Sequence, residues 1–219
     1  MTRPSSAARP PGAHVVVGAG GHAKVVIAAM RAMGLRVDAV LDDSRDRWGE
    51  TFHGAPILGG IGELAGWPGV RAVITVGNNA RRRAIAEAHP GVDWLTVVHP
   101  AAIVHESATL GPGAMVMWRA VVEPDVVIGA HAIVNTGAAV CHDARVGDYA
   151  HVSVTSTLAG GAVVGRGVFL GMNACVIGTA RVGDWATVGA GASVVRDVPA
   201  GATAVGVPAR VISAKASAG

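Results

Sequence analysis

The hydrophobic positions in the second half of the chain follow a six-residue period. Every sixth residue from Val98 to Val194 is aliphatic, which makes seventeen positions without a miss. From Ala102 onward a small or short side chain stands two positions before each aliphatic residue, and a glycine often follows the aliphatic residue directly. Neither the 3.6-residue period of an α-helix nor the two-residue period of a strand gives this repeat. The pattern therefore predicts the hexapeptide repeat of a parallel β-helix.

Three hexapeptides would close one triangular coil of 18 residues, with the aliphatic and the small side chains pointing inward and the glycines relieving the backbone at the corners. Residues 18 positions apart would then stack, with about 4.8 Å between coils that are joined by parallel ladders. Each buried aliphatic side chain contributes about 1.5–3 kcal/mol, so the repeat carries a sizeable core. Handedness does not follow from this argument, because the general rule for parallel crossovers favours right-handed turns.

Ahead of the repeat, the hydrophobic pattern predicts a small α/β domain. Strands are expected at residues 14–17, 37–41 and 72–76, and helical segments at 25–33, 61–64 and 80–88. This order fits about one mononucleotide-binding half of a doubly wound fold, which makes the domain half-Rossmann-like. The expected organisation is a disordered tail at 1–13, the α/β domain at 14–95, the β-helix at 96–197 and a C-terminal cap and tail at 198–219.

A glycine-rich turn follows the first expected strand. Gly18, Gly20 and Ala23 match the spacing of the dinucleotide fingerprint, and Asp42 follows about 20 residues later, where an acid binds a ribose hydroxyl. The domain has room for one mononucleotide half only, so a nucleotide or a nucleotide-sugar is favoured over NAD, while a purely structural turn stays open. His22 has no packing reason to stand in the turn, which favours contact with a ligand.

Within the repeat, His142 and Asp143 form a candidate catalytic pair. His142 stands two positions after an inward valine, so it is expected to point outward near a corner, with Asp143 beside it. A neighbouring carboxylate fixes the tautomer of an imidazole and raises its basicity, which suits a general base, although a solvated surface histidine is the alternative. Gly160 lies 18 residues on, where its N–H could hold an oxyanion. His151 lies half a coil away, so a site that uses both histidines would be formed between subunits.

Composition narrows the class of protein. The 219 residues are 51% hydrophobic and 15% charged, with a net charge of +3, and no run of Lys and Arg argues for nucleic acid. No apolar run is long enough for a membrane span, and the first 13 residues have no apolar core typical of a signal peptide. Cys141 and Cys175 lie 34 residues apart, which does not match the coil repeat. Two free thiols in a cytoplasmic protein are expected.

Several motifs together resemble a family of bacterial sugar acetyltransferases that carry hexapeptide repeats. The family includes the sialic acid O-acetyltransferase type and relatives that N-acetylate 4-amino sugars on nucleotide carriers in the bacillosamine and perosamine pathways. The resemblance covers about residues 14 to 212 and rests on five motifs: Gly18-Ala-Gly-Gly-His-Ala-Lys-Val-Val, Leu41-Asp-Asp, Gly77-Asn-Asn, the segment from Asn135-Thr-Gly-Ala to His142-Asp, and Gly206-Val-Pro-Ala-Arg.

The resemblance implies a left-handed β-helix, a homotrimer with active sites between subunits, and acetyl-CoA as cosubstrate. A sugar amine would attack the thioester while His142 takes its proton and Asp143 orients the imidazole. The remaining implied contacts fall into two groups: for acetyl-CoA, His151, Gly160, Met172 and Ala190; for the nucleotide-sugar, Gly21, His22, Asp42, Asp43 and Asn135. No metal is implied.

Three positions depart from the pattern of the family. Cys141 precedes His142 where relatives often have an acid, and Thr155 stands where a glycine is common. Ser44 follows the paired aspartates where a basic residue can help to bind phosphate. The first two departures leave the implied mechanism intact, whereas the third leaves the carrier nucleotide open.

Other activities are compatible with parts of this pattern. O-acetylation of a sialic-acid-like sugar would use the same base, so the sequence does not separate it from N-acetylation. Carbonic anhydrases of this fold bind zinc through three histidines, but no histidine follows His151, and Gly160 and Phe169 stand one coil after the two candidates. A non-catalytic nucleotide-sensing module would bind the ligand without turnover.

Overall fold

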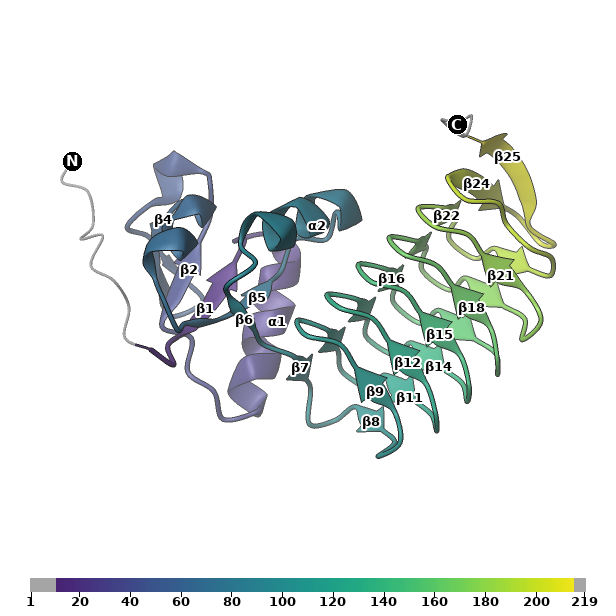
Figure 1. Cartoon of the computed structure of the whole chain (residues 1–219), viewed down its shortest axis with the longest axis horizontal. Helices are drawn as coiled ribbons and strands as arrows, with labels where there is room; N and C mark the ends of the chain where they lie inside the picture. Colours follow the sequence, from purple (N-terminus) through teal and green to yellow (C-terminus); the bar gives the residue numbers. More distant parts are fainter. Residues whose placement is uncertain (1–10, 215–219) are drawn as a thin grey trace. The chain divides into compact units, whose positions relative to one another are not determined.

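The computed structural model describes residues 11–214, without the side chain of Ala214, and these residues fall into two compact units that divide between His99 and Pro100 (Figure 1). Residues 1–10 and 215–219 of the two expected tails lie outside this range. Where the structure does describe the expected tails, they make backbone contacts. The N–H of Gly12 donates to the carbonyl of Gly69 at 2.7 Å, and Ser213 pairs with Thr203 in a strand.

The first unit is an α/β layer structure around one sheet. The order of its strands is β3-β4-β2-β1-β5-β6, and all neighbours are parallel except β3 and β4. Its elements are β1 (His14–Val17), α1 (Gly21–Ala32), β2 (Ala39–Leu41), η1 (Arg45–Arg47), β3 (Thr51–Phe52), β4 (Ala55–Gly59), η2 (Ile61–Gly66), β5 (Arg71–Ile74), α2 (Asn79–Ala88), β6 (Asp93–Trp94) and β7 (Val97–Val98).

The centre of this sheet is apolar on both faces, as expected for parallel strands that helices cover. Val15, Val16 and Val17 of β1 are fully buried, and Ile27 and Met30 of α1 are also buried. The expected half-Rossmann-like arrangement is confirmed, with local differences that include the unexpected strand β6. Helix α1 begins at Gly21, four residues earlier than expected, and the short hairpin β3–β4 was not expected. That hairpin turns at His53 and Gly54, both with positive φ, which is a turn pattern that lacks the usual Asn-Gly signal.

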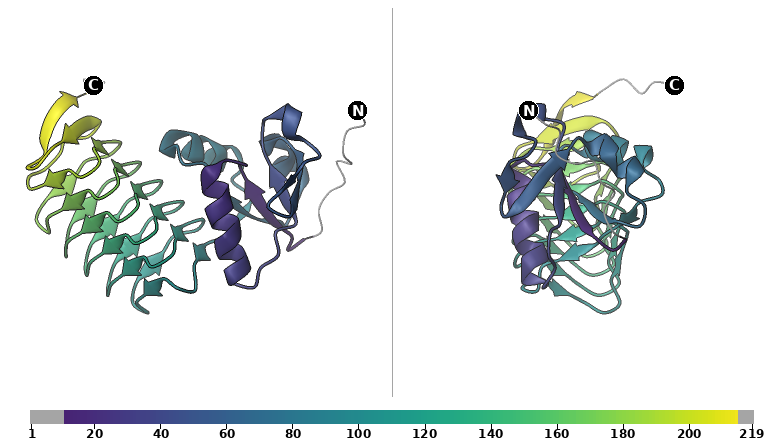
Figure 2. Two further views of the ribbon diagram at one scale, coloured as in Figure 1. Left: turned by 180° about the vertical axis from the view of Figure 1, so that it is seen from behind. Right: turned by 90° about the vertical axis from the view of Figure 1, so that its left-hand side faces the viewer.

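The second unit is a left-handed parallel β-helix, and its coils stack as successive triangles (Figures 1 and 2). Residues that pair in neighbouring strands are 18 positions apart, as in the register of Ala139 with Thr157 and of His151 with Phe169. Three sheets form the sides. One contains β10 (Met115–Val116), β13 (Ile133–Val134), β16 (His151–Val152), β19 (Phe169–Leu170), β22 (Thr187–Val188), β24 (Ala202–Val205) and β25 (Arg210–Ala214).

The other two sides are built in the same way. The second contains β8 (Ile103–Val104), β11 (Val121–Val122), β14 (Ala139–Val140), β17 (Thr157–Leu158), β20 (Cys175–Val176) and β23 (Ser193–Val194). The third contains β9 (Thr109–Leu110), β12 (Val127–Ile128), β15 (Arg145–Val146), β18 (Val163–Val164) and β21 (Arg181–Val182). At the C-terminal end, β24 pairs in parallel with β22 and β25 pairs antiparallel with β24, so a hairpin covers the last coil.

The inward positions of the repeat form the core of the β-helix. Every aliphatic position from Val116 to Val194 is buried, and so is the small residue two positions before each. Val104 and Leu110 in the first coil are only half-buried, although they are in phase with the repeat. Within the β-helix the first coil has a neighbouring coil on one side only, so its inward side chains contact fewer atoms.

The glycines that follow the aliphatic positions act differently from the expectation. Positive φ at the corners belongs to other positions, most of them occupied by non-glycine residues such as Asp125, Asp143 and Asn173. The glycines are needed for close approach between coils. A Cβ on Gly147 would lie 2.5 Å from the backbone nitrogen of Arg166, and the same clash recurs along the stack. These positions therefore set the distance between coils rather than the turn conformation.

Neither helix of the described residues is long and apolar enough to cross a membrane. Cys141 and Cys175 are both free thiols, in agreement with their spacing in the repeat.

Candidate active site

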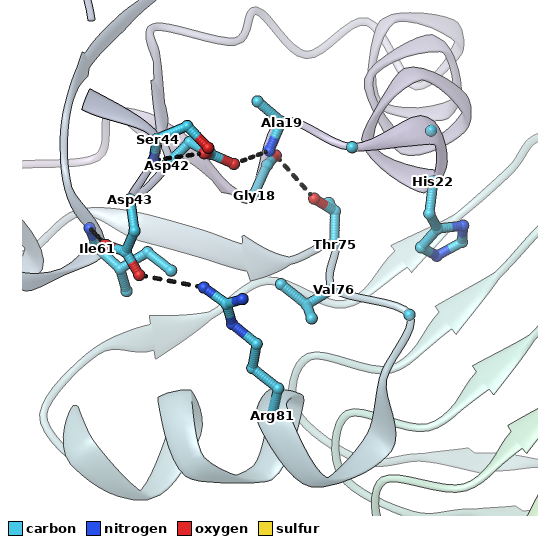
Figure 3. Close-up of a pocket in the computed structure, with 13 residues that line it drawn as sticks. Gly18, Ala19, His22, Asp42, Asp43, Ser44, Ile61, Thr75, Val76 and Arg81 are labelled. Carbon is cyan, nitrogen blue, oxygen red and sulfur yellow. Dashed lines mark hydrogen bonds and ion pairs between the residues drawn. The ribbon is translucent and has the colours of Figure 1, made fainter. Parts of the chain in front are cut away.

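The carboxyl ends of three parallel strands in the first unit open into a cavity of about 610 Å³ (Figure 3). Gly18 follows β1, Asp42 follows β2 and Thr75 follows β5, so the cavity lies where ligands bind in open α/β sheets. Gly21, His22, Asp42 and Asp43, which the sequence analysis assigns to the nucleotide-sugar, all line it.

The glycine-rich turn is shaped by close packing and by the start of α1. Gly18 has φ +102°, and a Cβ there would lie 3.2 Å from Thr75 Oγ1, which donates to the Gly18 carbonyl at 3.0 Å. Gly20 precedes α1 with no side-chain cap, and the first turn of the helix has no acidic residue. Unbonded N–H groups and the positive end of the helix dipole make such a terminus suitable for an anion.

The carboxylate of Asp42 accepts hydrogen bonds from two backbone N–H groups around the cavity. Its Oδ2 accepts from the N–H of Ala19 at 2.7 Å and its Oδ1 from the N–H of Ser44 at 2.9 Å. Burial acts to raise the pKa of Asp42, but these hydrogen bonds and the charge of Arg47 outweigh it and lower the pKa. The carboxylate therefore stays ionised and keeps remaining lone pairs for a hydroxyl of a ligand.

Asp43 and Arg81 form an ion pair on the wall of the cavity. Arg81 Nη2 lies 3.2 Å from Asp43 Oδ2, while Asp43 Oδ1 accepts from the N–H of Ile61 at 3.0 Å. The side chains of Arg81 and Asp43 are 58% and 54% exposed, so the pair is open to exchange with a ligand. Arg81 supplies a permanent positive charge on a wall that otherwise carries two carboxylates.

His22 is held neutral at the rim of the cavity. Burial, together with the positive charge of Arg82, lowers its pKa to about 4. Arg82 is fully buried and braces the turn after β5, because it donates to the Val76 carbonyl at 2.9 Å and to Asn79 Oδ1 at 2.9 Å. The cavity therefore presents an uncharged imidazole at neutral pH.

The second unit places His142 at a corner after β14, next to Asp143. His142 Nδ1 lies 2.9 Å from Asp143 Oδ2, and the two side chains are 64% and 67% exposed. The hydrogen bond to Asp143 is the main cause of the raised pKa of His142, and the charges of Asp143 and Glu123 act in the same direction. With the Nδ1 proton donated to Asp143, the Nε2 atom carries the lone pair that a general base needs.

The ring of His142 lies against Gly160 of the next coil. A Cβ on Gly160 would come within 2.5 Å of His142 Cε1 and 2.6 Å of Nε2, so only glycine leaves the ring in this position. The N–H of Gly161 donates to the His142 carbonyl at 2.9 Å and keeps the two corners in register. The 18-residue spacing thus brings together the candidate base and the glycine that the sequence pairs with it.

His151 and Asn135 meet on the outer face of a neighbouring side. Asn135 Nδ2 lies 3.0 Å from His151 Nε2, and Asn135 Oδ1 accepts from the N–H of Thr136 at 2.8 Å. His151 is buried and its ring packs edge-on against Phe169 with 5.4 Å between centroids. These two residues form a fixed pair, separate from the corner that holds His142.

Met172 and Ala190 stack one coil apart at the corner that follows this side, and both are exposed. Elsewhere, corner N–H groups are taken up by carboxylates, as when Ala130 donates to Asp148 Oδ1 at 2.8 Å. Within residues 11–214, the N–H groups of Met172, Ala190 and Gly160 make no such bond. They are therefore available to carbonyl oxygens of a ligand.

Sequence reasoning missed three charged residues at these places. Arg81 and Arg47 act around the cavity from elements far apart in the sequence, and no spacing rule links them to Asp42 or Asp43. Glu123 was assigned no role from the sequence, yet it accepts from the N–H of His142 at 2.8 Å. Its position about one coil before His142 was a signal that could have revealed this contact. Over the described range, no cluster of three or more His, Cys, Asp or Glu could hold a metal.

Comparison with known proteins gives three concordant matches. Residues 15–89 match the PglD N-terminal domain. The chain is 41% identical over 109 residues to the UDP-N-acetylbacillosamine N-acetyltransferase of Bacillus subtilis (strain 168), and this match spans 47% of the chain and half the length of that relative. A mutant of the GDP-perosamine N-acetyltransferase from Caulobacter crescentus, solved with CoA and GDP-perosamine, superposes with a TM-score of 0.87 and 38% identity, covering 92% and 97% of the two chains.

A further solved structure has the same two-part architecture. The acetyltransferase domain of PglB from Neisseria gonorrhoeae, in complex with acetyl coenzyme A, superposes with a TM-score of 0.87 at 35% identity and covers 93% of this chain and all of that one. The resemblance that the sequence motifs indicate is therefore confirmed. This chain belongs to the family of PglD-type sugar acetyltransferases, in which an α/β domain precedes a hexapeptide-repeat β-helix.

Proposed function

We propose that this protein transfers the acetyl group of acetyl-CoA to the amino group of a nucleotide-linked amino-deoxysugar. The observation that carries the proposal is the His142–Asp143 pair, whose ring lies against Gly160. A solvated surface histidine would have no need of a glycine in the facing coil. The perosamine and bacillosamine relatives are named for N-acetylation of such sugars, which supports the choice of an amine as the acceptor.

In the proposed reaction, the amine nitrogen attacks the thioester carbonyl carbon and a C–N bond forms. His142 Nε2 takes the proton that the nitrogen loses, and Asp143 stabilises the resulting imidazolium. The tetrahedral intermediate then expels the thiolate as the C–S bond breaks. The proton on His142 passes to the thiolate, so the products are CoA thiol and the acetamido sugar, and the base is regenerated.

The cavity of the first unit is the proposed site for the nucleotide. The amino end of α1, at Gly21 and His22, faces the phosphates. Asp42 and Asp43 accept hydrogen bonds from hydroxyl or base N–H groups, and Asn135 is proposed to contact the sugar. Arg81 is proposed to take the role that a basic residue in place of Ser44 would have, because it brings a positive charge to the same cavity.

Acetyl-CoA is proposed to lie along the β-helix, where the free N–H groups of Met172 and Ala190 can bind the amide carbonyls of pantetheine. The N–H of Gly160 would hold the thioester oxygen and His151 would lie beside the thioester. His142 and His151 stand on different sides of one coil, half a coil apart. This supports a homotrimer in which active sites form between subunits. The two free cysteines fit the reducing conditions of the cytoplasm, where we place the enzyme.

The test is release of CoA thiol from acetyl-CoA with UDP-, GDP- and dTDP-linked 4-amino sugars and with free sialic acid. Turnover with one amino sugar, reduced roughly 10²- to 10⁴-fold in His142→Ala, is the expected result. Turnover with sialic acid alone would show O-acetylation instead. A His142→Ala variant as fast as the parent would overturn the assignment of the base. Binding of nucleotide-sugars without any turnover would indicate a sensing module.

A further inference from the structure

Glu123 lies beside the candidate base His142 but has no role in the proposed function. It belongs to the corner one coil before His142, and its Oε2 accepts from the N–H of His142 at 2.8 Å. Burial, and after it the Glu123 carboxylate, raises the pKa of the thiol of Cys141, the residue just before the base. Glu123 therefore binds the backbone of the candidate base and acts on the charge state of the residue before it.

Other carboxylates at the corners of the β-helix resemble Glu123, but the N–H groups that they accept from do not belong to a histidine. Asp148 accepts from the N–H of Ala130 at 2.8 Å, and Asp184 from the N–H of Arg166 at 2.9 Å. These residues satisfy a backbone N–H and stabilise the stack of coils. Glu123 makes the same kind of bond, but it does so to the residue that carries the imidazole.

The charges that surround His142 come from two coils. Asp143 lies on its own corner, and Glu123 lies on the preceding one, where Asp125 stands 18 residues before Asp143. The two coils that follow offer no charge in this column, because Gly160 and Gly178 occupy the positions that stack on His142. Because burial and the Glu123 carboxylate raise the pKa of the Cys141 thiol, Cys141 adds no charge beside the imidazole. The imidazolium is thus flanked by carboxylates on one side and by glycines on the other.

We propose that Glu123 is a positioning residue for His142: it fixes the Cys141–His142 peptide and supplies, from the preceding coil, a second negative charge that stabilises the imidazolium. This inference rests on the proposed role of His142 as the base. Asp143 orients the ring through Nδ1, whereas Glu123 acts on its backbone and through its charge.

The experiment compares Glu123→Gln with the parent by NMR titration of His142 in the full chain and by the pH dependence of kcat/KM. Glutamine still accepts a hydrogen bond but removes the charge, so folding is preserved. The titration midpoint of His142 and the acid limb of kcat/KM should both move to lower pH, because the protonated ring loses a stabilising charge. The plateau of kcat should fall roughly two- to tenfold, less than for loss of the base itself, while KM for acetyl-CoA stays unchanged.

Asp148→Asn is the matched control, because Asp148 makes the same carboxylate-to-backbone bond at another corner. It should leave the titration of His142 and the acid limb where they are in the parent. Glu123→Gln and parent profiles that coincide in both measurements would overturn the proposal. A shifted midpoint combined with no turnover of any substrate by the parent would support the coupling of Glu123 to His142 and overturn the acetyltransferase proposal instead, because the titration does not depend on activity.

Discussion

In the β-helix, the neighbour of a residue is the residue 18 positions away, whereas in the α/β unit the neighbours of a site residue come from unrelated parts of the chain. Gly160 lies against His142 because the coil repeats. Arg81 reaches Asp43 across 38 residues because a helix and a strand end happen to meet at the cavity. Contacts between site residues can therefore be predicted from the sequence in the β-helix but not in the α/β unit.

The two units also hold their glycines for different reasons. In the α/β unit, Gly20 and Gly21 have open space around the position of a Cβ, which suits the approach of a ligand to the backbone. In the β-helix, a Cβ on Gly147 would strike backbone atoms of the next coil. We therefore expect the glycines of the turn to matter for the proposed ligand binding and the glycines between coils to matter for the fold.

The largest expected effect is on the stability of the β-helix. Gly147→Ala places a methyl group 2.5 Å from the nitrogen of Arg166, and neither backbone can move without breaking ladder bonds. We expect a loss of about 3 kcal/mol or more in the free energy of unfolding, at or above the usual cost of overpacking, measured by denaturant titration. Gly191→Asn is the control, because Gly191 has φ +67° in open space and Asn173 has φ +58° one coil earlier. Equal losses in both variants would contradict the close-approach explanation.

The second effect concerns catalysis at the same kind of position. Gly160→Ala meets the ring of His142 rather than backbone, so the ring can rotate away and the fold should survive. Displacement of the base by about 1 Å should lower kcat by about 10²-fold, with KM for the nucleotide-sugar unchanged. Steady-state kinetics beside Gly191→Asn checks this. A kcat within twofold of the parent would show that the contact with Gly160 does not position the ring.

These two variants show what could be predicted from the sequence. The six-residue period defined the coils, the inward residues and the stack of His142 on Gly160, because a repeat converts sequence distance into spatial distance. The predicted role of the glycines that follow the aliphatic positions was wrong, because the six-residue period does not distinguish a turn conformation from a close approach of two backbones. The half-burial of Val104 and Leu110 was missed because the end of a stack has the same period as its middle.

The cavity of the α/β unit was predictable only in part. The resemblance assigned Gly21, His22, Asp42 and Asp43 to one ligand, and in the structure all four line one cavity at the carboxyl ends of parallel strands. The charge of the cavity was not predictable, since Arg81 enters from α2 and the pKa of His22 depends on burial and on Arg82. Such contacts depend on tertiary packing, which no local pattern encodes.

The third effect concerns how the free energy of unfolding depends on pH, which has opposite signs for His22 in the α/β unit and His142 in the β-helix. His22 has a folded-state pKa of about 4, below its usual 6.5, so its neutral form stabilises the fold above pH 6.5 and this stability is lost as the pH falls toward 4. Between pH 7 and 4.5 the parent should lose about 2 kcal/mol more than His22→Gln, measured by chemical unfolding. Parallel losses in the two proteins would contradict the neutral state of the half-buried His22.

His142 provides the opposite sign for comparison. Its pKa is raised by Asp143, so its contribution is present below the usual histidine pKa and is lost as the pH rises through the folded value. Because His142 is solvent-exposed, His142→Ala should leave the loss on acidification close to that of the parent. A larger difference for His142→Ala than for His22→Gln would reverse the assignment of the acid-sensitive histidine.

The smallest effect tests whether Arg81 binds a ligand or only neutralises the neighbouring Asp43. Arg81→Gln removes a half-exposed charge, so it should weaken binding of a nucleoside diphosphate by roughly fivefold, or about 1 kcal/mol, more at low salt than at high salt. Calorimetry with GDP or UDP, beside the corresponding nucleoside, separates phosphate contact from the rest of the site. The nucleoside should bind both proteins equally, because Arg81 is assigned to the phosphates. In an Asp43→Asn background the loss should persist, since it does not arise from an uncompensated Asp43. A loss that disappears in that background would instead show that Arg81 serves to neutralise Asp43, and that the amino end of α1 binds the phosphates without it.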